Sequence, residues 1–159
     1  MSNPKMRRFL LDTGVLLGFI RKAEWAERVW KELNLDSKEA IIFTSIICVG
    51  ELLALSEKLG WGKSKKSRLE EVLAKYSALD INDQGVLRAY AMIDAWTHGQ
   101  KVDAPRRTPP PKPAISMQQN DLWIAATAHE SQATLLSTDK DFKHLKEIWF
   151  GFHYVDQNH

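Results

Sequence analysis

Short apolar runs alternate along the chain with longer segments in which hydrophobic residues recur every three to four positions. The short runs predict buried strands at residues 8–11, 40–43, 79–81, 134–137 and 148–155. The longer segments predict helices at 13–34 with a break near Lys22, and at 44–59, 63–76, 82–96 and 117–132. Strands that alternate with helices favour a parallel arrangement. The pattern therefore predicts an α/β fold with a central, mainly parallel sheet of four or five strands.

One segment breaks this pattern. Residues 97–116 hold five of the six prolines, and proline blocks both helices and inner strands, so an extended surface loop is expected. The same segment carries the cations Lys101, Arg106, Arg107 and Lys112. It is therefore either a passive insertion or a cationic arm that contacts a polyanionic substrate.

Composition narrows the class of protein. A chain of 159 residues with 44% hydrophobic and 26% charged residues fits one globular domain, spanning 1–159 with the insertion at about 97–116. Neither 9–20 nor 40–55 supplies the ~18 uninterrupted apolar residues of a membrane span. The single cysteine, Cys48, cannot form an internal disulfide, which favours a reducing cytoplasm. A net charge of +2 is compatible with nucleic acid but does not by itself indicate it.

An acid interrupts the first apolar run. Asp12 lies within residues 9–20, where an unpaired charge costs several kcal/mol. A strand that ends at Leu11 and a helix that begins at Thr13 place Asp12 at the carboxyl end of the strand, where α/β sheets bind ligands. Asp12 is therefore either a helix cap or a functional acid.

Three further acids occupy related positions. Glu51 shares a helix face with Ile47, Cys48 and Leu55, so it points inward and needs either a cationic partner or a metal. Asp121 opens a helix, where the helix dipole alone would favour it. Asp139 follows the strand at 134–137, where it either caps the next helix or binds a ligand.

In a parallel sheet these four acids converge on one edge, and carboxylates held together repel one another unless a cation lies among them. Oxygen donors without histidine or cysteine suit Mg²⁺ or Mn²⁺ better than zinc. Such ions stabilise the charge that develops during phosphodiester hydrolysis. The acids therefore indicate a metal-dependent phosphoryl-transfer site.

Four segments resemble, in order, the motifs of PIN-domain ribonucleases, and most closely those of VapC-type toxins of toxin–antitoxin pairs. They read Leu-Leu-Asp-Thr-Gly-Val-Leu, Ser-Ile-Ile-Cys-Val-Gly-Glu-Leu-Leu, Asn-Asp-Leu-Trp-Ile-Ala-Ala-Thr-Ala and Leu-Leu-Ser-Thr-Asp-Lys-Asp-Phe. The resemblance spans residues 9 to 142 and implies a three-layer α/β/α fold and an endoribonuclease that uses Mg²⁺ or Mn²⁺. It also implies an RNA substrate, a homodimer and a small antitoxin protein that blocks the acidic site.

The resemblance also assigns residues. The catalytic and metal-binding acids of the family fall on Asp12, Glu51, Asp121 and Asp139, with Asp141 as an additional acid and Ser137, Thr13 and Asn120 as auxiliary residues. Cys48 stands where the second motif often carries a hydroxyl residue. The basic residues expected to contact the RNA backbone, if they are not simply solvated, are Lys63, Lys65, Lys66, Arg68, Arg106 and Arg107.

Three other functions stay open at this point. The long insertion before Asp121 leaves room for a stand-alone PIN nuclease of RNA processing, and a PIN-like domain that binds RNA or a partner without cutting is another alternative. A phosphatase of the haloacid-dehalogenase type also begins with an aspartate after a strand. That family needs a second aspartate two residues later, where this chain has Gly14.

Overall fold

Five parallel strands form the centre of the molecule. In the computed structural model, which describes residues 3 and 5–158, the sheet has the order β3-β2-β1-β4-β5 and every neighbouring pair is parallel. The strands are β1 (Arg7–Leu11), β2 (Ala40–Ser45), β3 (Ser77–Leu79), β4 (Thr134–Ser137) and β5 (Gly151–Tyr154). The outermost positions of the predicted domain, 1, 2, 4 and 159, lie outside the described residues.

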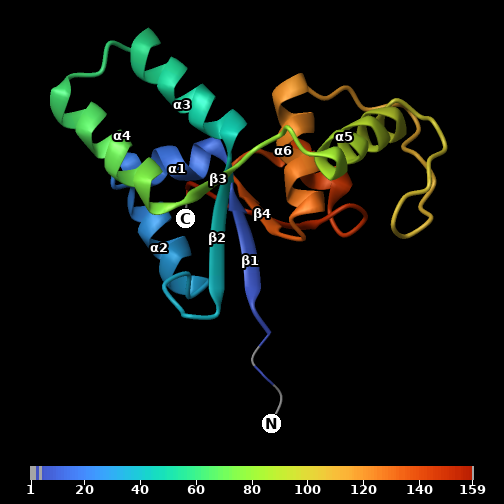
Figure 1. Cartoon of the computed structure of the whole chain (residues 1–159), viewed down its shortest axis with the longest axis horizontal. Coiled ribbons are helices and arrows are strands. Elements are labelled where there is room, and N and C mark those ends of the chain that lie inside the picture. The colour runs from blue at the N-terminus through green and yellow to red at the C-terminus, as the bar shows by residue number, and fades with distance from the viewer. Residues whose placement is uncertain (1–2, 4, 159) are drawn as a thin grey trace.

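Helices cover both sides of this sheet. They are α1 (Thr13–Ile20), α2 (Glu24–Glu32), α3 (Ile46–Lys58), α4 (Lys63–Lys75), α5 (Gln84–Thr97), α6 (Gln119–Glu130) and the 3₁₀ helix η1 (Lys140–Leu145). Figure 1 shows α1 to α4 on one side of the sheet and α5 and α6 on the other. The predicted three-layer α/β/α fold and the predicted mainly parallel sheet are both confirmed.

Several element boundaries differ from the prediction by a few residues, and two of these differences have an identifiable reason. β2 continues past Phe43 because the Thr44 hydroxyl donates to the Leu11 carbonyl at 2.9 Å, and this bond satisfies the polar side chain inside the sheet. β3 ends at Leu79 instead of Ile81. Ile81 packs against a small separate cluster with Val86 and Ala89, so its apolar character serves α5 and not the strand.

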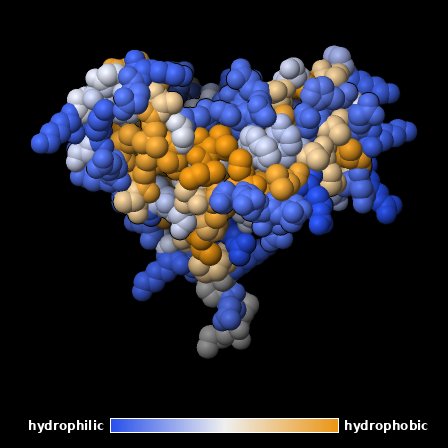
Figure 2. Space-filling view, turned by 45° about the horizontal axis from the view of Figure 1, so that its top comes forward, coloured by the Kyte–Doolittle hydropathy of each residue, from blue (hydrophilic) through white to orange (hydrophobic). Residues whose placement is uncertain are grey.

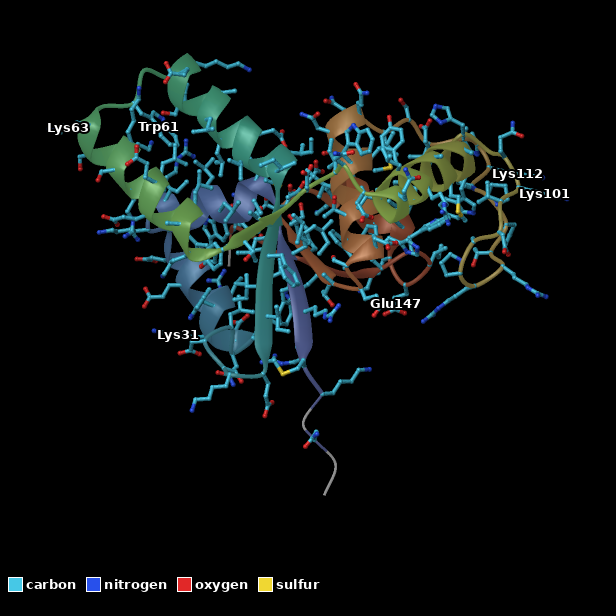
Figure 3. The ribbon with its side chains drawn as sticks, in the orientation of Figure 1. Lys31, Trp61, Lys63, Lys101, Lys112 and Glu147 are labelled. Carbon is cyan, nitrogen blue, oxygen red and sulfur yellow. The ribbon has the colours of Figure 1, made fainter. Side chains whose placement is uncertain are left out.

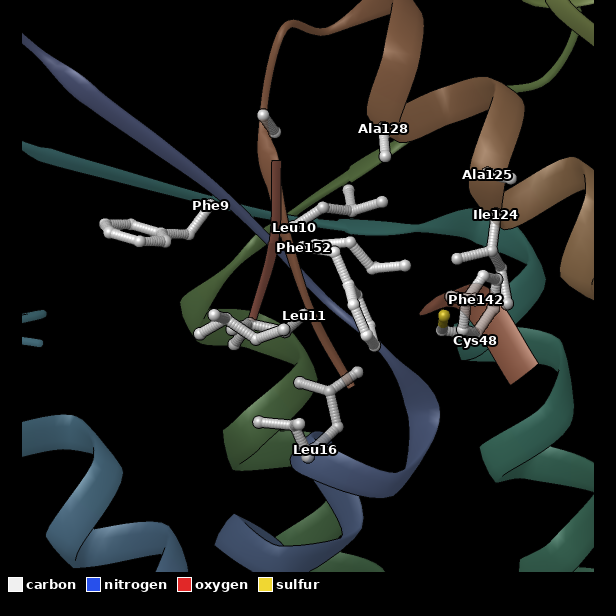
Figure 4. Packing of buried hydrophobic residues seen from close by; sticks show 14 of the residues in the cluster. Phe9, Leu10, Leu11, Leu16, Cys48, Ile124, Ala125, Ala128, Phe142 and Phe152 are labelled. Atoms are coloured by element: carbon white, nitrogen blue, oxygen red, sulfur yellow. The ribbon is translucent and has the colours of Figure 1, made fainter. Parts of the chain in front are cut away.

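A close-packed core lies directly beneath the first strand's carboxyl end. Leu10, Leu11 and Leu16 have no exposed surface, and they pack with Phe142 and Phe152 from the far end of the chain (Figure 4). Burying a side chain of this size contributes about 1.5–3 kcal/mol. The turn from β1 into α1 therefore rests on the most rigid part of the molecule.

The proline-rich segment is tied to the helices that it joins. The Ile115 amide donates to the Thr97 carbonyl at 2.8 Å, and the Trp96 indole N–H donates to the Thr108 carbonyl at 3.2 Å. Ala104 is only 2% exposed. The predicted surface loop thus has a fixed path along α5. None of the helices in the described part of the chain has the length and hydropathy needed to cross a bilayer.

Candidate active site

Asp12 lies between β1 and α1 with only 7% of its surface exposed. One carboxylate oxygen, Oδ1, accepts the Thr13 amide at 2.8 Å and lies 3.8 Å from the Cys48 thiol, which donates to it. The other, Oδ2, accepts the Ser137 hydroxyl at 2.5 Å. Asp12 is therefore a helix cap, but its hydrogen bonds reach well beyond the helix that it begins.

Glu51 faces the same place from α3. Its Oε1 accepts the Thr13 hydroxyl at 3.0 Å, so Thr13 connects Glu51 to the start of α1. The ion pairs found among the described residues do not include Glu51. The alternative of a structural ion pair with a lysine or arginine thus has no support in this structure.

Asp121 and Asp139 complete the group from the other side of the sheet. Asp121 is half-buried in the first turn of α6. Asp139 begins η1, where its carboxylate accepts the Asp141 amide at 2.9 Å and its own amide donates to the Ser137 hydroxyl at 3.0 Å. Asp141 and Asn120 are exposed beside this group. Ser137 therefore joins Asp139 to Asp12 through one hydroxyl.

Burial and mutual repulsion change the acidity of two of these acids. The pKa of Asp12 rises to about 6, first through burial and then through the charges of Glu51 and Asp139, against the lowering effect of the hydrogen bonds from Ser137 and Thr13. The pKa of Asp121 rises to about 7, first through burial and then through the charges of Asp12, Asp139, Glu51 and Asp141. Five carboxylates thus share one electrostatic environment.

This acidic cluster, defined as Asp12, Glu51, Asp121, Asp139 and Asp141, suits a hard divalent cation by its donor atoms. All five supply carboxylate oxygens, the ligands that Mg²⁺ and Mn²⁺ take. Within residues 3 and 5–158, no three histidine, cysteine, aspartate or glutamate side chains are close enough to form a ready-made ligand set. A cation would relieve the repulsion that raises the pKa values of Asp12 and Asp121, so charge and donor chemistry both fit.

The raised pKa values make the stability of the metal-free protein depend on pH. Because the folded state holds protons on Asp12 and Asp121 that the unfolded state has lost, the free energy of unfolding falls as the pH rises from about 4 to about 7. We expect the melting temperature in chelator to fall across this interval, and Mg²⁺ to restore it at neutral pH. Thermal unfolding followed by circular dichroism measures both. A melting temperature that rises with pH across the interval would contradict the repulsion.

The predicted basic residues are not brought to the acidic cluster. Lys66 pairs with Glu57 at 3.1 Å, Arg68 lies 3.5 Å from Glu71, and the Lys65 amine lies 4.2 Å from the centre of the Trp61 ring. The Lys66–Glu57 pair joins α4 to α3, whereas the Arg68–Glu71 contact lies within α4. Figure 3 shows Lys63 and Trp61 at the outer end of this helix pair.

The arginines of the insertion lie elsewhere. Pro105, next to Arg106 and Arg107, lines a hollow with His129 and Glu130 at the C-terminal end of α6. Asp121 is at the opposite end of that helix, about 12 Å away along its axis. The hollow that Pro105 lines therefore lies at the other end of α6 from Asp121, and the RNA contacts of Arg106 and Arg107 stay a prediction.

Two contacts of the site were not predicted from the sequence. Cys48 is a fully buried core residue, and its thiol also contacts Asp12. Burial raises the pKa of that thiol to about 12, so it stays a neutral donor. Gly14 packs so closely against Thr138 that a Cβ atom would collide with the Thr138 hydroxyl. The sequence could have indicated the Cys48 contact, because Cys48 shares a helix face with Glu51. No local sequence pattern indicated the close packing of Gly14.

Comparisons with known proteins place the chain in a family. The PIN domain matches residues 9–148. A VapBC2 structure from Rickettsia felis, bound to a promoter DNA fragment, has a chain that is 19% identical with a TM-score of 0.73, over 94% of this chain and 99% of that one. DNA-bound VapBC from Salmonella typhimurium gives 18% identity and a TM-score of 0.68, over 95% and 100% of the two chains.

FitAcB from Neisseria gonorrhoeae gives 24% identity and a TM-score of 0.62, over 95% of this chain and 99% of that one. No curated protein matches the chain. At these identities the likeness of the solved structures shows a shared fold. The match over residues 9–148 shows more, because it includes every acid of the cluster. The chain therefore belongs to the PIN domain family.

Proposed function

We propose that this protein is a metal-dependent endoribonuclease that hydrolyses phosphodiester bonds in RNA. The observation that supports the proposal is the acidic cluster itself, in which Asp12 is almost fully buried and its charge is opposed by the carboxylates of Glu51, Asp121 and Asp139. Keeping such repulsion has a large free-energy cost, which a divalent cation offsets. Nuclease activity is also what membership of the PIN domain family supports.

The residues would divide the work as follows. Asp12, Glu51, Asp121 and Asp139 would hold Mg²⁺ or Mn²⁺, and Asp141 would add negative charge at the edge. A bound ion would supply charge neutralisation at the phosphate and would acidify water. Ser137 fixes the Asp12 carboxylate and the Asp139 backbone with one hydroxyl, and Thr13 fixes Glu51. Asn120, exposed beside Asp121, is proposed as an auxiliary contact to substrate.

RNA cleavage tests this proposal directly. The purified protein should cut single-stranded or structured RNA in Mg²⁺ or Mn²⁺ and should stop when a chelator is added. Asp121→Asn should lower the cleavage rate by at least about 100-fold, because a ligand to the ion is lost. Gel analysis of end-labelled RNA measures the rate. Cleavage that ignores chelator would contradict the mechanism, and tight RNA binding with no cleavage would favour a binding domain.

We also propose an antitoxin partner and a homodimer, both in the cytoplasm. The similar structures include a toxin–antitoxin complex from Klebsiella pneumoniae, and α3 exposes Ile46 at 42% and Leu53 at 50%, as an interface would. Figure 2 shows hydrophobic residues gathered on one face of the molecule.

A short reading frame for a DNA-binding protein directly upstream would support the antitoxin. Its absence would favour a stand-alone nuclease, and sedimentation of the pure protein tests the dimer.

Residues 1–159 are proposed to act as one nuclease unit, with 97–116 as an insertion into it. The basic residues Lys63, Lys65, Lys66, Arg68, Arg106 and Arg107 stay predicted RNA contacts.

A further inference from the structure

A hollow of about 470 Å³ lies beside the acidic cluster, between the end of the proline-rich segment and η1. It is lined by Ile115, Ser116, Lys140, Asp141, Lys143 and His144. Asp141 belongs to the cluster as well, since its charge acts on Asp121 and its amide donates to Asp139. The hollow and the reaction centre therefore share a wall.

Cationic and polar groups line the rest of this hollow. Lys140 and Lys143 are exposed, whereas Lys66 and Arg68 on α4 are already paired with glutamates. The Nε2 atom of His144 is buried and has no hydrogen-bond partner in this structure. A buried polar atom left without a partner is costly unless a ligand or water satisfies it. The hollow thus offers positive charge at its surface, and the unpartnered His144 ring nitrogen lies buried behind that surface.

An aromatic ring borders the same edge. Tyr154 ends β5, is 37% exposed, and lies opposite Ser137 in the β4–β5 register. The Lys140 amine lies 5.1 Å from the centre of its ring. Ser137 in turn holds Asp12. An exposed tyrosine next to lysines is the combination on which proteins stack the bases of single-stranded nucleic acids while they neutralise the backbone.

We propose that this hollow is a subsite for single-stranded RNA, which binds a nucleotide adjacent to the bond that is cut. Lys143 contacts the phosphate of that nucleotide, and Tyr154 stacks on its base. Ser116, at the end of the insertion, forms the opposite wall, so the proline-rich segment shapes the substrate site through its last residues and not through Arg106 and Arg107. The subsite rests on the proposed nuclease function and adds the residues that position its substrate.

RNA affinity of the metal-free protein is the first test, because no cleavage then interferes. Fluorescence anisotropy of a short fluorescein-labelled single-stranded RNA in chelator measures the Kd. Lys143→Ala should weaken binding about tenfold and lower the salt slope by about one. Lys146→Ala removes one exposed lysine at the end of the same 3₁₀ helix, but outside the hollow, and should change the Kd little.

The tyrosine has its own pair of variants. Tyr154→Leu should weaken binding about tenfold, whereas Tyr154→Phe, which keeps the ring, should bind nearly as the natural protein does. With Mg²⁺ present, the weaker RNA binding of Lys143→Ala and Tyr154→Leu should appear in cleavage kinetics as a higher KM. Unchanged melting temperatures would show that both variants fold.

The outcomes separate the subsite from the nuclease. If the natural protein cleaves RNA but Lys143→Ala binds and cleaves like Lys146→Ala, the subsite is wrong and the nuclease stands. If Lys143→Ala and Tyr154→Leu weaken RNA binding although no cleavage occurs, the subsite stands and the nuclease is wrong. Equal loss in Lys143→Ala and Lys146→Ala would mean diffuse electrostatic attraction and would also overturn the subsite.

Discussion

Asp12→Asn is expected to abolish RNA cleavage and, at the same time, to make the metal-free protein harder to unfold. Cleavage falls by at least about 100-fold because the central carboxylate of the cluster is lost. Stability rises because a neutral amide escapes the cost of burying a charge and, to a smaller extent, the repulsion from Glu51 and Asp139, which together lift the pKa of Asp12 from 3.8 to about 6. That shift corresponds to a penalty of up to about 3 kcal/mol at neutral pH.

The measured gain in stability should be smaller than this ceiling. An amide accepts the Ser137 and Cys48 hydrogens less strongly than a carboxylate does, so we expect about 1–2 kcal/mol in chelator. Urea unfolding at neutral pH measures the free energy of unfolding, and Asp36→Asn, at an exposed position, is the matched control. A destabilised Asp12→Asn would mean that its hydrogen bonds outweigh the repulsion. Full activity in the variant would refute the proposed site.

Gly14→Ala is the second change with a large expected effect. The added Cβ would collide with the Thr138 hydroxyl, so the Thr138 side chain must rotate or the segment that carries Ser137 and Asp139 must move, and we expect the movement because the segment is closely packed. A displacement of about 1 Å at a reaction centre lowers the rate by about 100-fold. Overpacking of this kind also costs about 1–3 kcal/mol of stability. Cleavage kinetics and urea unfolding measure the two effects.

A second substitution should reverse this damage. Thr138→Ala removes the hydroxyl, and the next nearest atom, the Thr138 Cβ, lies at an ordinary 3.4 Å. The Gly14→Ala, Thr138→Ala double variant should therefore recover much of the lost activity. Gly50→Ala is the matched control, since no atom lies within 4 Å of its Cβ position and alanine favours helices by up to about 1 kcal/mol. If Gly14→Ala were as harmless as Gly50→Ala, the close contact would have no part in the site.

The positions of the acids were predictable because they follow from local pattern and one general rule. Asp12 and Asp139 come directly after buried strands, and the carboxyl ends of parallel strands meet at one edge. Glu51 followed from helical spacing against apolar neighbours, and Asp121 from its place at the start of a helix. The orientation of β5 and its place beside β4 had no comparable signal, since the aromatic run at 148–155 fits a strand in either direction.

The features of the fold and site that were not predicted depend on contacts between segments far apart in the sequence, and no local sequence pattern contains such contacts. Lys66 looked free until the α3–α4 pairing brought Glu57 to it. Gly14 and Thr138 meet only because β1 and β4 are neighbours. Proline content marked 97–116 as a surface loop, but which of its residues approach the acidic cluster depends on its path along α5. Sequence composition therefore predicted the loop, but it did not indicate that Ile115 and Ser116 share a hollow with Asp141.

The pairing of β1 with β4 also sets when the site can exist. The bond between Asp12 and Ser137 joins residues 125 positions apart, and Asp121 and Asp139 come equally late in the chain. At about 5–20 residues per second, a ribosome needs about 6–25 s to pass from the first acid to the last. Throughout that time the emerging polypeptide carries Asp12 without its partners. The proposed ribonuclease would therefore stay inactive while the ribosome is still making it.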